Sequence, residues 1–224
     1  SDVYKRQEQG LTEVLGQKIA SIRPGDYRFR DQNGDGKITS ADLVLLGSGE
    51  PDFTGGLTNT VSYKNLSLSV AMQFSYGATV FNANLHSLTS GRDGHNQIAE
   101  MNTKSWSPTL YDADGNVFFA GNNEAKYRMP GGVALNYCTS KMLEDGSFLR
   151  IGDITLAYAL GKKVAKKVGM QNIKLFASVK NLCVFTKYTG FDPEVNTRQG
   201  QTGDLMPSLD YSAYPRNRSY SCLL

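Results

Sequence analysis

The sequence predicts an all-β fold of antiparallel strands, and three features of one stretch support this prediction. From Leu66 to Tyr76, large apolar residues alternate strictly with small polar ones. Successive side chains of a strand point to opposite faces, so this period of two predicts a strand with one apolar face. The stretch has eleven residues, whereas soluble strands average about 5–6 and strands that cross an outer membrane need about 9–11. Its polar face carries no charge, which suits the lumen of a membrane barrel, although the same alternation also fits a soluble sheet.

Length and composition exclude several classes of protein. The chain has 224 residues, a net charge of +3, 40% hydrophobic residues and a mean hydropathy of −0.37. No apolar run approaches the ~18 residues of a membrane helix, but half of each barrel strand is polar, so a barrel fits these values. A large barrel is much longer than this chain, which is therefore expected to form only part of one. The small net charge and scattered lysines and arginines predict no binding of nucleic acid.

The cysteines and histidines predict neither a disulfide framework nor a catalytic site. Cys138, Cys183 and Cys222 are far apart and odd in number, without the paired spacing of metal ligands. The two histidines, His86 and His95, are not surrounded by a Ser/His/Asp motif. The sequence therefore predicts that the protein is not an enzyme.

Residues 1–23 are an unassigned leader. The opening heptad, Ser1–Gln7, lacks the apolar core of a signal peptide and matches nothing downstream, so we expect a non-native start. Pro24, Gly25 and Asp26 then predict a turn.

The segment Asp31–Asp42 has the spacing of a twelve-residue calcium loop. Oxygen donors fall at positions 1, 3, 5, 9 and 12, with a backbone carbonyl at position 7. These donors are Asp31, Asn33, Asp35, Thr39 and Asp42, and the carbonyl is that of Lys37. Gly36 stands at the sharp turn, and Ile38 is the expected apolar anchor. The sequence predicts a structural Ca²⁺ site, and the alternative is an Asx-rich turn that binds no ion strongly.

The surroundings of this loop differ from those of an EF-hand pair. Asp42 stands where an EF-hand has glutamate, although the shorter side chain still coordinates calcium in dockerin-type loops. Residues 25–30 predict a strand in place of the entering helix, and residues 41–46 predict one helical turn. We therefore expect the ion to stiffen the chain locally, without a signalling role.

A second alternating stretch, Leu57–Tyr63, precedes the first. Lys64 and Asn65 lie between them and predict a tight hairpin turn, with Asn65 at positive φ. The two strands are therefore expected to pair antiparallel. Tyr63 at the turn and Phe74 at the far end fit either the aromatic girdles of a membrane barrel or ordinary strand positions.

Long polar loops and short connections alternate along the rest of the chain. Residues 89–142 and 187–211 are rich in Gly, Asn, Asp and Ser and predict two long loops. Residues 147–160 and 173–185 predict strands. The lysine-rich connection between them, residues 161–169, predicts a solvated turn or one helical turn, in preference to a lipid-binding segment. Short turns at one end and long extracellular loops at the other are typical of an outer-membrane barrel.

Several short motifs follow one another in order after residue 24. They are the calcium-type loop, Gly47, Pro51, Gly55–Gly56, Tyr63–Lys64, Trp106–Pro108, Asp145–Arg150, Ile154–Leu156, Tyr158, Asn181–Leu182, Lys187–Val195, Tyr214–Arg216 and Tyr220. As an ordered set they resemble the C-terminal barrel region of SusC/RagA-type TonB-dependent outer-membrane transporters. Each motif alone is weak, but the ordered set is specific.

This resemblance implies that residues 24–224 form a partial C-terminal TonB-dependent receptor β-barrel in the cell outer membrane, in contact with membrane lipid. It also implies that the whole protein imports an oligosaccharide or peptide substrate, works with a SusD-like surface lipoprotein and draws energy from the TonB complex. The plug domain, the TonB-contacting segment and the final strand of the family are expected outside these residues.

The alternative is a soluble, secreted β-sandwich that binds glycans and carries a dockerin-like calcium loop. A sandwich packs the apolar faces of its strands against a second sheet, whereas a barrel wall leaves them facing lipid. The surroundings of Leu68, Val70 and Ile154 therefore distinguish the two folds.

Overall fold

The computed structural model describes residues 13–14, 17–18, 25–27, 29–91, 96–122, 124–130, 139–195 and 208–223, with only the backbone described before residue 25. The chain forms two compact units. The first combines Ser1–Leu46 with Ala83–Met142, and the second combines Gly47–Asn82 with Leu143–Leu224. The predicted leader, residues 1–23, lies outside the described residues except for four positions, as do residues 196–207 of the second predicted loop.

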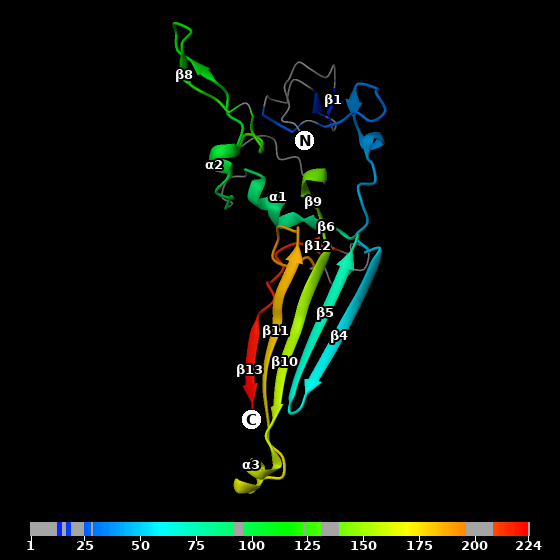
Figure 1. Ribbon diagram of the computed structural model, residues 1–224. Helices are drawn as coiled ribbons and strands as arrows, with labels where there is room; N and C mark the ends of the chain where they lie inside the picture. The colour runs from blue at the N-terminus through cyan, green and yellow to red at the C-terminus, as the bar shows by residue number, and fades with distance from the viewer. Residues whose placement is uncertain are drawn as a thin grey trace. The chain divides into compact units, whose positions relative to one another are not determined.

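A five-stranded antiparallel sheet dominates the second unit, in the order β13-β11-β10-β5-β4 (Figure 1). Its strands are β4 (Phe53–Tyr63), β5 (Leu66–Tyr76), β10 (Phe148–Ala159), β11 (Lys174–Thr186) and β13 (Ser219–Leu223). The predicted all-β antiparallel fold is confirmed, and β5 has the bounds that its alternation predicted.

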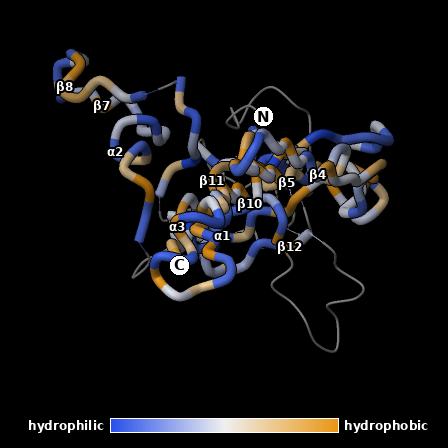
Figure 2. Tube along the Cα trace, turned by 60° about the horizontal axis from the view of Figure 1, so that its bottom comes forward, coloured by the Kyte–Doolittle hydropathy of each residue, from blue (hydrophilic) through white to orange (hydrophobic). Residues whose placement is uncertain are grey.

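The two faces of this sheet differ in chemistry because the register aligns like side chains. Leu68 pairs with Val61 on one side and Leu156 on the other, so large apolar side chains form continuous rows across the strands. Leu68 is 39% exposed and Leu156 is 43% exposed. On the opposite face, the Thr60 hydroxyl donates to Ser69 Oγ at 3.1 Å. Figure 2 shows hydrophobic and hydrophilic residues interspersed where β4, β5, β10 and β11 lie.

A β-bulge at Gly152 keeps this segregation intact along β10. The register shifts between Ile151, opposite Met72, and Asp153, so one extra residue of β10 fits against β5. Without the bulge, Ile151 and Ile154 would point to opposite faces, because side chains alternate. With it, Ile151 lies beside Met72 and Ile154 beside Val70, and all four share the apolar face. The sequence alternation alone did not predict this irregularity.

Three local predictions are wrong. In the β4–β5 turn, Lys64 takes the positive φ, 52°, in place of Asn65. The described residues of 25–30 form a turn and an isolated bridge and not a strand, and the Gly25 carbonyl accepts from the Met129 amide of another loop. The helical turn expected at 41–46 is a 3₁₀ turn, η2 (Ser40–Asp42), which begins earlier because the Asp42 carboxylate accepts from the Thr39 amide at its N-terminus, and exposed extended chain follows it.

Short elements complete both units. The first contains β1 (Glu13–Val14), β2 (Gln17–Lys18), β3 (Lys37–Ile38), α1 (Ala83–Thr89), α2 (Met101–Lys104), β7 (Leu110–Tyr111), β8 (Val117–Phe119) and η3 (Ser140–Met142). The second contains β6 (Thr79–Asn82), β9 (Leu143–Asp145), β12 (Leu209–Asp210) and α3 (Lys162–Lys167). Among the described residues, no helix is long and apolar enough to cross a membrane.

The two largest fully enclosed side chains among the described residues of the second unit lie at one end of the long sheet. Strands β12, β6 and β9 form a small sheet there, and Val80 and Asp210 within it have no exposed surface. The opposite end carries the β4–β5 turn and α3 (Figure 1). The enclosed end therefore anchors the residues that follow β11, which build the site described next.

Candidate ligand-binding site on the polar face

The segment Lys187–Val195, here called the strap, follows β11 and is bonded to side chains of the polar face. At its start, the Tyr188 hydroxyl donates to the Asp210 carboxylate at 2.5 Å, and the Thr189 amide donates to Glu144 at 2.8 Å. Burial and the hydrogen bond to Asp210 raise the pKa of Tyr188, so its hydroxyl stays protonated as the donor. These contacts hold the first half of the strap on the small sheet.

A buried ion pair fixes the second half of the strap to β10. Arg150 Nη2 lies 2.6 Å from Asp192 Oδ1, and the two side chains are 4% and 6% exposed. Arg150 Nη1 donates to Asn181 Oδ1 at 2.7 Å, and Asn181 stands at φ 53° in the matching irregularity of β11. The guanidinium also lies 5.4 Å from the centre of the Phe148 ring. An ion pair this enclosed depends on both partners, because removal of one leaves the other buried with a longer ion contact, Asp192 to Arg216 at 3.4 Å or Arg150 to Glu194 at 3.5 Å.

A second, more exposed pair extends this network. Arg216 Nη1 lies 3.0 Å from Glu194 Oε2, and Arg216 Nε lies 3.4 Å from Asp192 Oδ2. Gln73 Nε2, from the polar face of β5, donates to the same Glu194 oxygen at 3.0 Å. The side chains of Arg216 and Glu194 are half-exposed. Water screens this pair, so it remains available to exchange partners with a ligand.

The network borders a cavity of about 760 Å³ in the second unit. Its polar lining residues are Glu50, Thr54, Gln73, Ser75, Glu194, Ser208 and Arg216, and its apolar ones include Pro51, Phe148 and Pro193. Ligand pockets of small molecules commonly measure about 300–1,000 Å³ and combine apolar walls with a few placed polar groups. The lining offers amide, hydroxyl and charged groups of both signs, which suits recognition of a polar ligand by hydrogen bonds.

The sequence prediction of site residues did not include this network. Arg150, Asp192, Glu194 and Arg216 come from three separate segments, and only folding brings them together. A signal was present nonetheless. Arg150 is a charged residue at a polar-face position of β10, opposite Gln73, and a charged side chain on an inner face is expected to have a partner.

The predicted calcium-loop residues lie together in the first unit. Asp31 accepts from the amides of Gly34, at 2.6 Å, and Gly36, at 2.9 Å. Both glycines have the positive φ that a tight loop requires, 76° and 77°. Ile38 is buried, as expected of the apolar anchor. The backbone therefore turns tightly at these two glycines.

The remaining loop carboxylates also bind backbone amides. Asp35 Oδ1 accepts from Lys37, and Asp42 accepts from both Gln32 and Thr39. The amides of Thr39 and Gln32 lower the pKa of Asp42. Within the described ranges, no group of three or more His, Cys, Asp or Glu side chains is arranged to hold a metal ion. The donor types and the glycine positions nevertheless fit calcium, which prefers hard oxygen ligands.

The known proteins to which the chain is similar in sequence are TonB-dependent receptors. No family model matches the chain. It is 34% identical over 200 residues to TonB-dependent receptor P3 of Formosa agariphila, covering 88% of this chain and 18% of the relative. It is 26% identical over 202 residues to TonB-dependent receptor SusC of Bacteroides thetaiotaomicron, covering 88% of this chain and 17% of SusC. The chain thus spans less than a fifth of the length of these relatives.

Solved structures show the same fold. The RagAB peptide importer in its open-open state matches with a TM-score of 0.61 and 23% sequence identity, over 82% of this chain and 18% of that one. Its closed-closed state matches with a TM-score of 0.60 and 24% identity, over 82% and 18%. The five-stranded sheet therefore has the fold of a segment of that importer.

Proposed function

Because the chain is related over most of its length to TonB-dependent receptors of the SusC/RagA type, we propose that it forms part of the barrel wall of an outer-membrane nutrient transporter. The whole protein imports glycans or peptides. The chain is not an enzyme, since its relatives are receptors, and its contribution is to bind and guide a substrate.

The observation that carries this proposal is the contrast between the two faces of the five-stranded sheet. One face exposes leucine, valine and tyrosine side chains along strands of eleven residues or more. The other bears hydroxyls, Gln73 and the ion-pair network beside the cavity. A barrel wall has this arrangement, with lipid outside and a polar lumen inside. The cavity then lies on the lumen side, where a substrate passes.

The connections at the two ends of the sheet indicate which end of the strands faces the periplasm. Short connections join β4 to β5 and β10 to β11, while residues 77–147 connect β5 to β10 at the other end. Periplasmic turns are short in outer-membrane barrels and extracellular loops are long. We therefore propose that the strap and the long connection between β5 and β10 are extracellular, where they contribute to the substrate surface. A SusD-like lipoprotein covers that surface, and the TonB complex supplies energy through another part of the protein.

Fractionation tests the proposal. The full-length protein, expressed in its host, is expected in the outer membrane and in solution only after detergent is added, because its apolar face needs lipid or a micelle. Deletion of its gene is expected to abolish growth on one glycan or peptide source and to leave growth on simple sugars unchanged. Recovery of the protein in the soluble fraction would instead favour a secreted module.

The soluble β-sandwich is the second candidate, and the sheet itself argues against it. In the described part of the second unit, the only other sheet is the small β12-β6-β9 sheet, whose strands have two to four residues. Leu68 and Leu156 keep a large exposed fraction in its presence. A sandwich requires a second layer of comparable length over these residues.

We also propose that the loop Asp31–Asp42 binds calcium as a local clip. The side chains of Asp31, Asn33, Asp35, Thr39 and Asp42 and the Lys37 carbonyl would hold the ion. Bound calcium would neutralise carboxylates that now accept only from amides. The loop would then resist opening, and the first unit would be stiffer.

Trypsin provides a local test of the calcium clip, because Lys37 is exposed within the loop. Calcium at ten times its Kd is expected to slow cleavage after Lys37 by about tenfold, since binding lowers the population of the open loop in that proportion. The variant Asp31→Ala/Asp35→Ala is expected to show no such protection. Asp112→Ala/Asp114→Ala, in another Asx turn of the same unit, serves as the matched control and is expected to keep it. Identical cleavage rates with and without calcium in the parent exclude the site.

A further inference from the structure

The connection between β10 and β11 concentrates positive charge. Four lysines fall within the six residues of α3, at positions 162, 163, 166 and 167, and Lys174 opens β11. No aspartate or glutamate occurs from Gly161 to Lys174. All four lysines of α3 are exposed, and Ala165 is its one buried residue. This segment, Gly161–Lys174, is called the basic connection below.

The basic connection also exposes aliphatic side chains. Val164, Val168 and Met170 are about half-exposed or more, with Val168 at 62%. A plain solvated turn needs only polar side chains, and three exposed aliphatic residues beside four lysines are not expected of one. Lysines alternating with aliphatic residues on a short helix are typical of segments that lie at a membrane surface.

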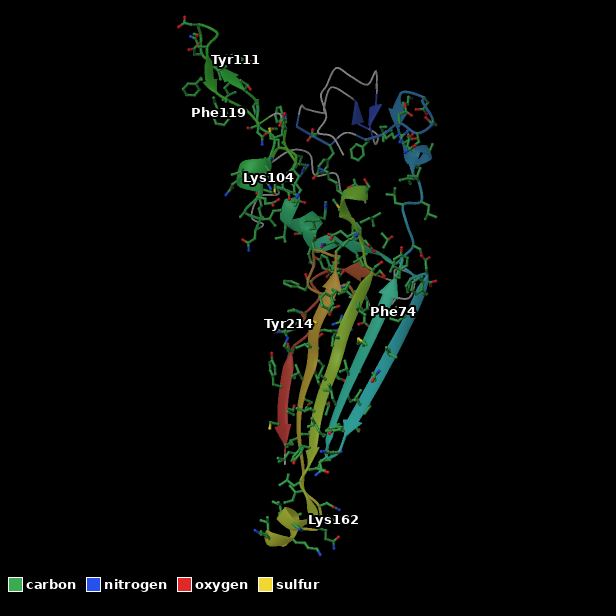
Figure 3. All side chains as sticks on the ribbon, viewed as in Figure 1. Phe74, Lys104, Tyr111, Phe119, Lys162 and Tyr214 are labelled. Atoms are coloured by element: carbon green, nitrogen blue, oxygen red, sulfur yellow. The ribbon has the colours of Figure 1, made fainter. Side chains whose placement is uncertain are left out.

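The basic connection lies at the end of the apolar face that carries the β4–β5 turn. Figure 3 shows Lys162 beyond the ends of the long strands, at the end that carries the β4–β5 turn. The Ala159 amide donates to the Asn65 carbonyl at 2.8 Å, so this turn is bonded to the last residue of β10, two residues before the basic connection begins. Tyr63 and Tyr158, both exposed, lie at the same end of the apolar face. Lys64 Nζ lies 5.2 Å from the centre of the Tyr63 ring.

Aromatic residues followed by lysines mark the level at which hydrocarbon gives way to headgroups. Tyrosine rings are enriched at that interface, and lysines extend beyond it to reach anionic groups. On the five-stranded sheet, the rows of apolar side chains are followed by the tyrosines and then by the lysines in the direction of α3. The charge of the segment is complementary to the phosphates of a phospholipid leaflet.

From this arrangement we infer that the basic connection binds the phosphate headgroups of anionic phospholipids in the leaflet next to the short turns of the barrel. The lysine ammonium groups pair with headgroup phosphates, and Val164, Val168 and Met170 enter the headgroup layer. This inference rests on the proposed outer-membrane function, because it needs the apolar face to lie in a bilayer. It assigns lipid binding to a segment for which the sequence pattern alone favoured solvent.

Lipid titration of the full-length protein in neutral detergent tests this inference. Solubilised phosphatidylglycerol is added, and bound lipids are counted by native mass spectrometry. The variant with all four α3 lysines changed to glutamine is expected to bind phosphatidylglycerol about tenfold more weakly, since each lysine near an anionic surface contributes to attraction. The matched variant with the same lysines changed to arginine keeps the charge and is expected to bind as the parent does. Val168→Ser/Met170→Ser is expected to weaken binding less than the glutamine variant.

The controls distinguish a lipid headgroup from free phosphate as the ligand. They also distinguish failure of this inference from failure of the proposed function. Phosphatidylcholine, which has no net charge, is expected to bind weakly to every variant, and inorganic phosphate at 10 times the lipid concentration is expected not to compete. Competition by inorganic phosphate, or equal binding by the glutamine variant and the parent, would overturn the inference. Either result leaves the outer-membrane location intact, whereas a soluble full-length protein defeats the proposed function itself.

Discussion

Replacing Val70 with arginine is expected to destabilise the membrane-inserted protein by about 2–4 kcal/mol, the cost of a charge on the lipid face near the middle of a barrel strand. Val70 lies halfway along β5, beside Asn59 of β4 and Ile154 of β10, on the face that carries the apolar rows. In a soluble protein, a partly exposed valine changed to arginine would cost little, because water would solvate the guanidinium. The substitution therefore distinguishes lipid from water as the environment of this face.

The neighbouring residue provides the matched control. Ser69 is adjacent to Val70 but points to the polar face, where its hydroxyl accepts from Thr60. Ser69→Arg is expected to change stability by about 1 kcal/mol or less, since it removes one hydrogen bond and adds a charge to a wet lumen. Urea unfolding of the full-length protein in lipid vesicles measures both variants. Equal losses, or a loss below about 0.5 kcal/mol for Val70→Arg, contradict the lipid-facing assignment.

Replacing Arg150 with methionine is expected to cost about 3 kcal/mol, near the lower end of the 3–5 kcal/mol reported for breaking a buried ion pair. Asp192 is 6% exposed and would retain the Glu194 amide as a donor, at 2.9 Å, and the longer contact with Arg216, at 3.4 Å. The loss is partial because Arg216 compensates some of the buried charge. Since the strap borders the cavity, substrate affinity is expected to fall along with stability.

Two further variants define the role of this pair. Arg216→Met removes a half-exposed charge and is expected to cost about 1 kcal/mol or less. Arg150→Met/Asp192→Leu removes both buried charges and is expected to regain most of the stability lost by Arg150→Met, because no unpaired charge remains. Urea unfolding again gives the free energies. If Arg150→Met and Arg216→Met cost the same, the enclosed pair does not hold the strap.

The strands were predictable because their evidence is local. The alternation in β5 and the two-residue turn before it predict a hairpin from neighbouring residues alone, and the register confirms it. The register of β5 against β10 depends on the bulge at Gly152. An isolated glycine in a strand often marks a bulge, but it does not identify which strand pairs there or in which register. The positive φ at Lys64 likewise contradicts the general preference for Asn in such turns.

The candidate site was less predictable than the fold. Arg150, Asp192 and Arg216 belong to segments that approach only when β10 and the strap are in place, and no local period records such a contact. The motifs Asp145–Arg150, Lys187–Val195 and Tyr214–Arg216 were recognised from family resemblance, but their side-chain pairing required coordinates. The calcium-type loop is the opposite case, since all its donors lie within twelve residues, and its occupancy by an ion stays a prediction.

The pairing of β5 with β10 has a consequence for how such proteins diversify. These neighbouring strands are joined through residues 77–147, so much of one compact unit is inserted between two strands of a continuous sheet. Loop-closure entropy grows only with the logarithm of length, by about 0.6 kcal/mol for each doubling. Inserted chain can therefore lengthen, shorten or be exchanged at small thermodynamic expense while the strand pairing persists. One scaffold can in this way acquire new ligand preferences, at the cost of slower folding, because distant partners must meet before the sheet closes.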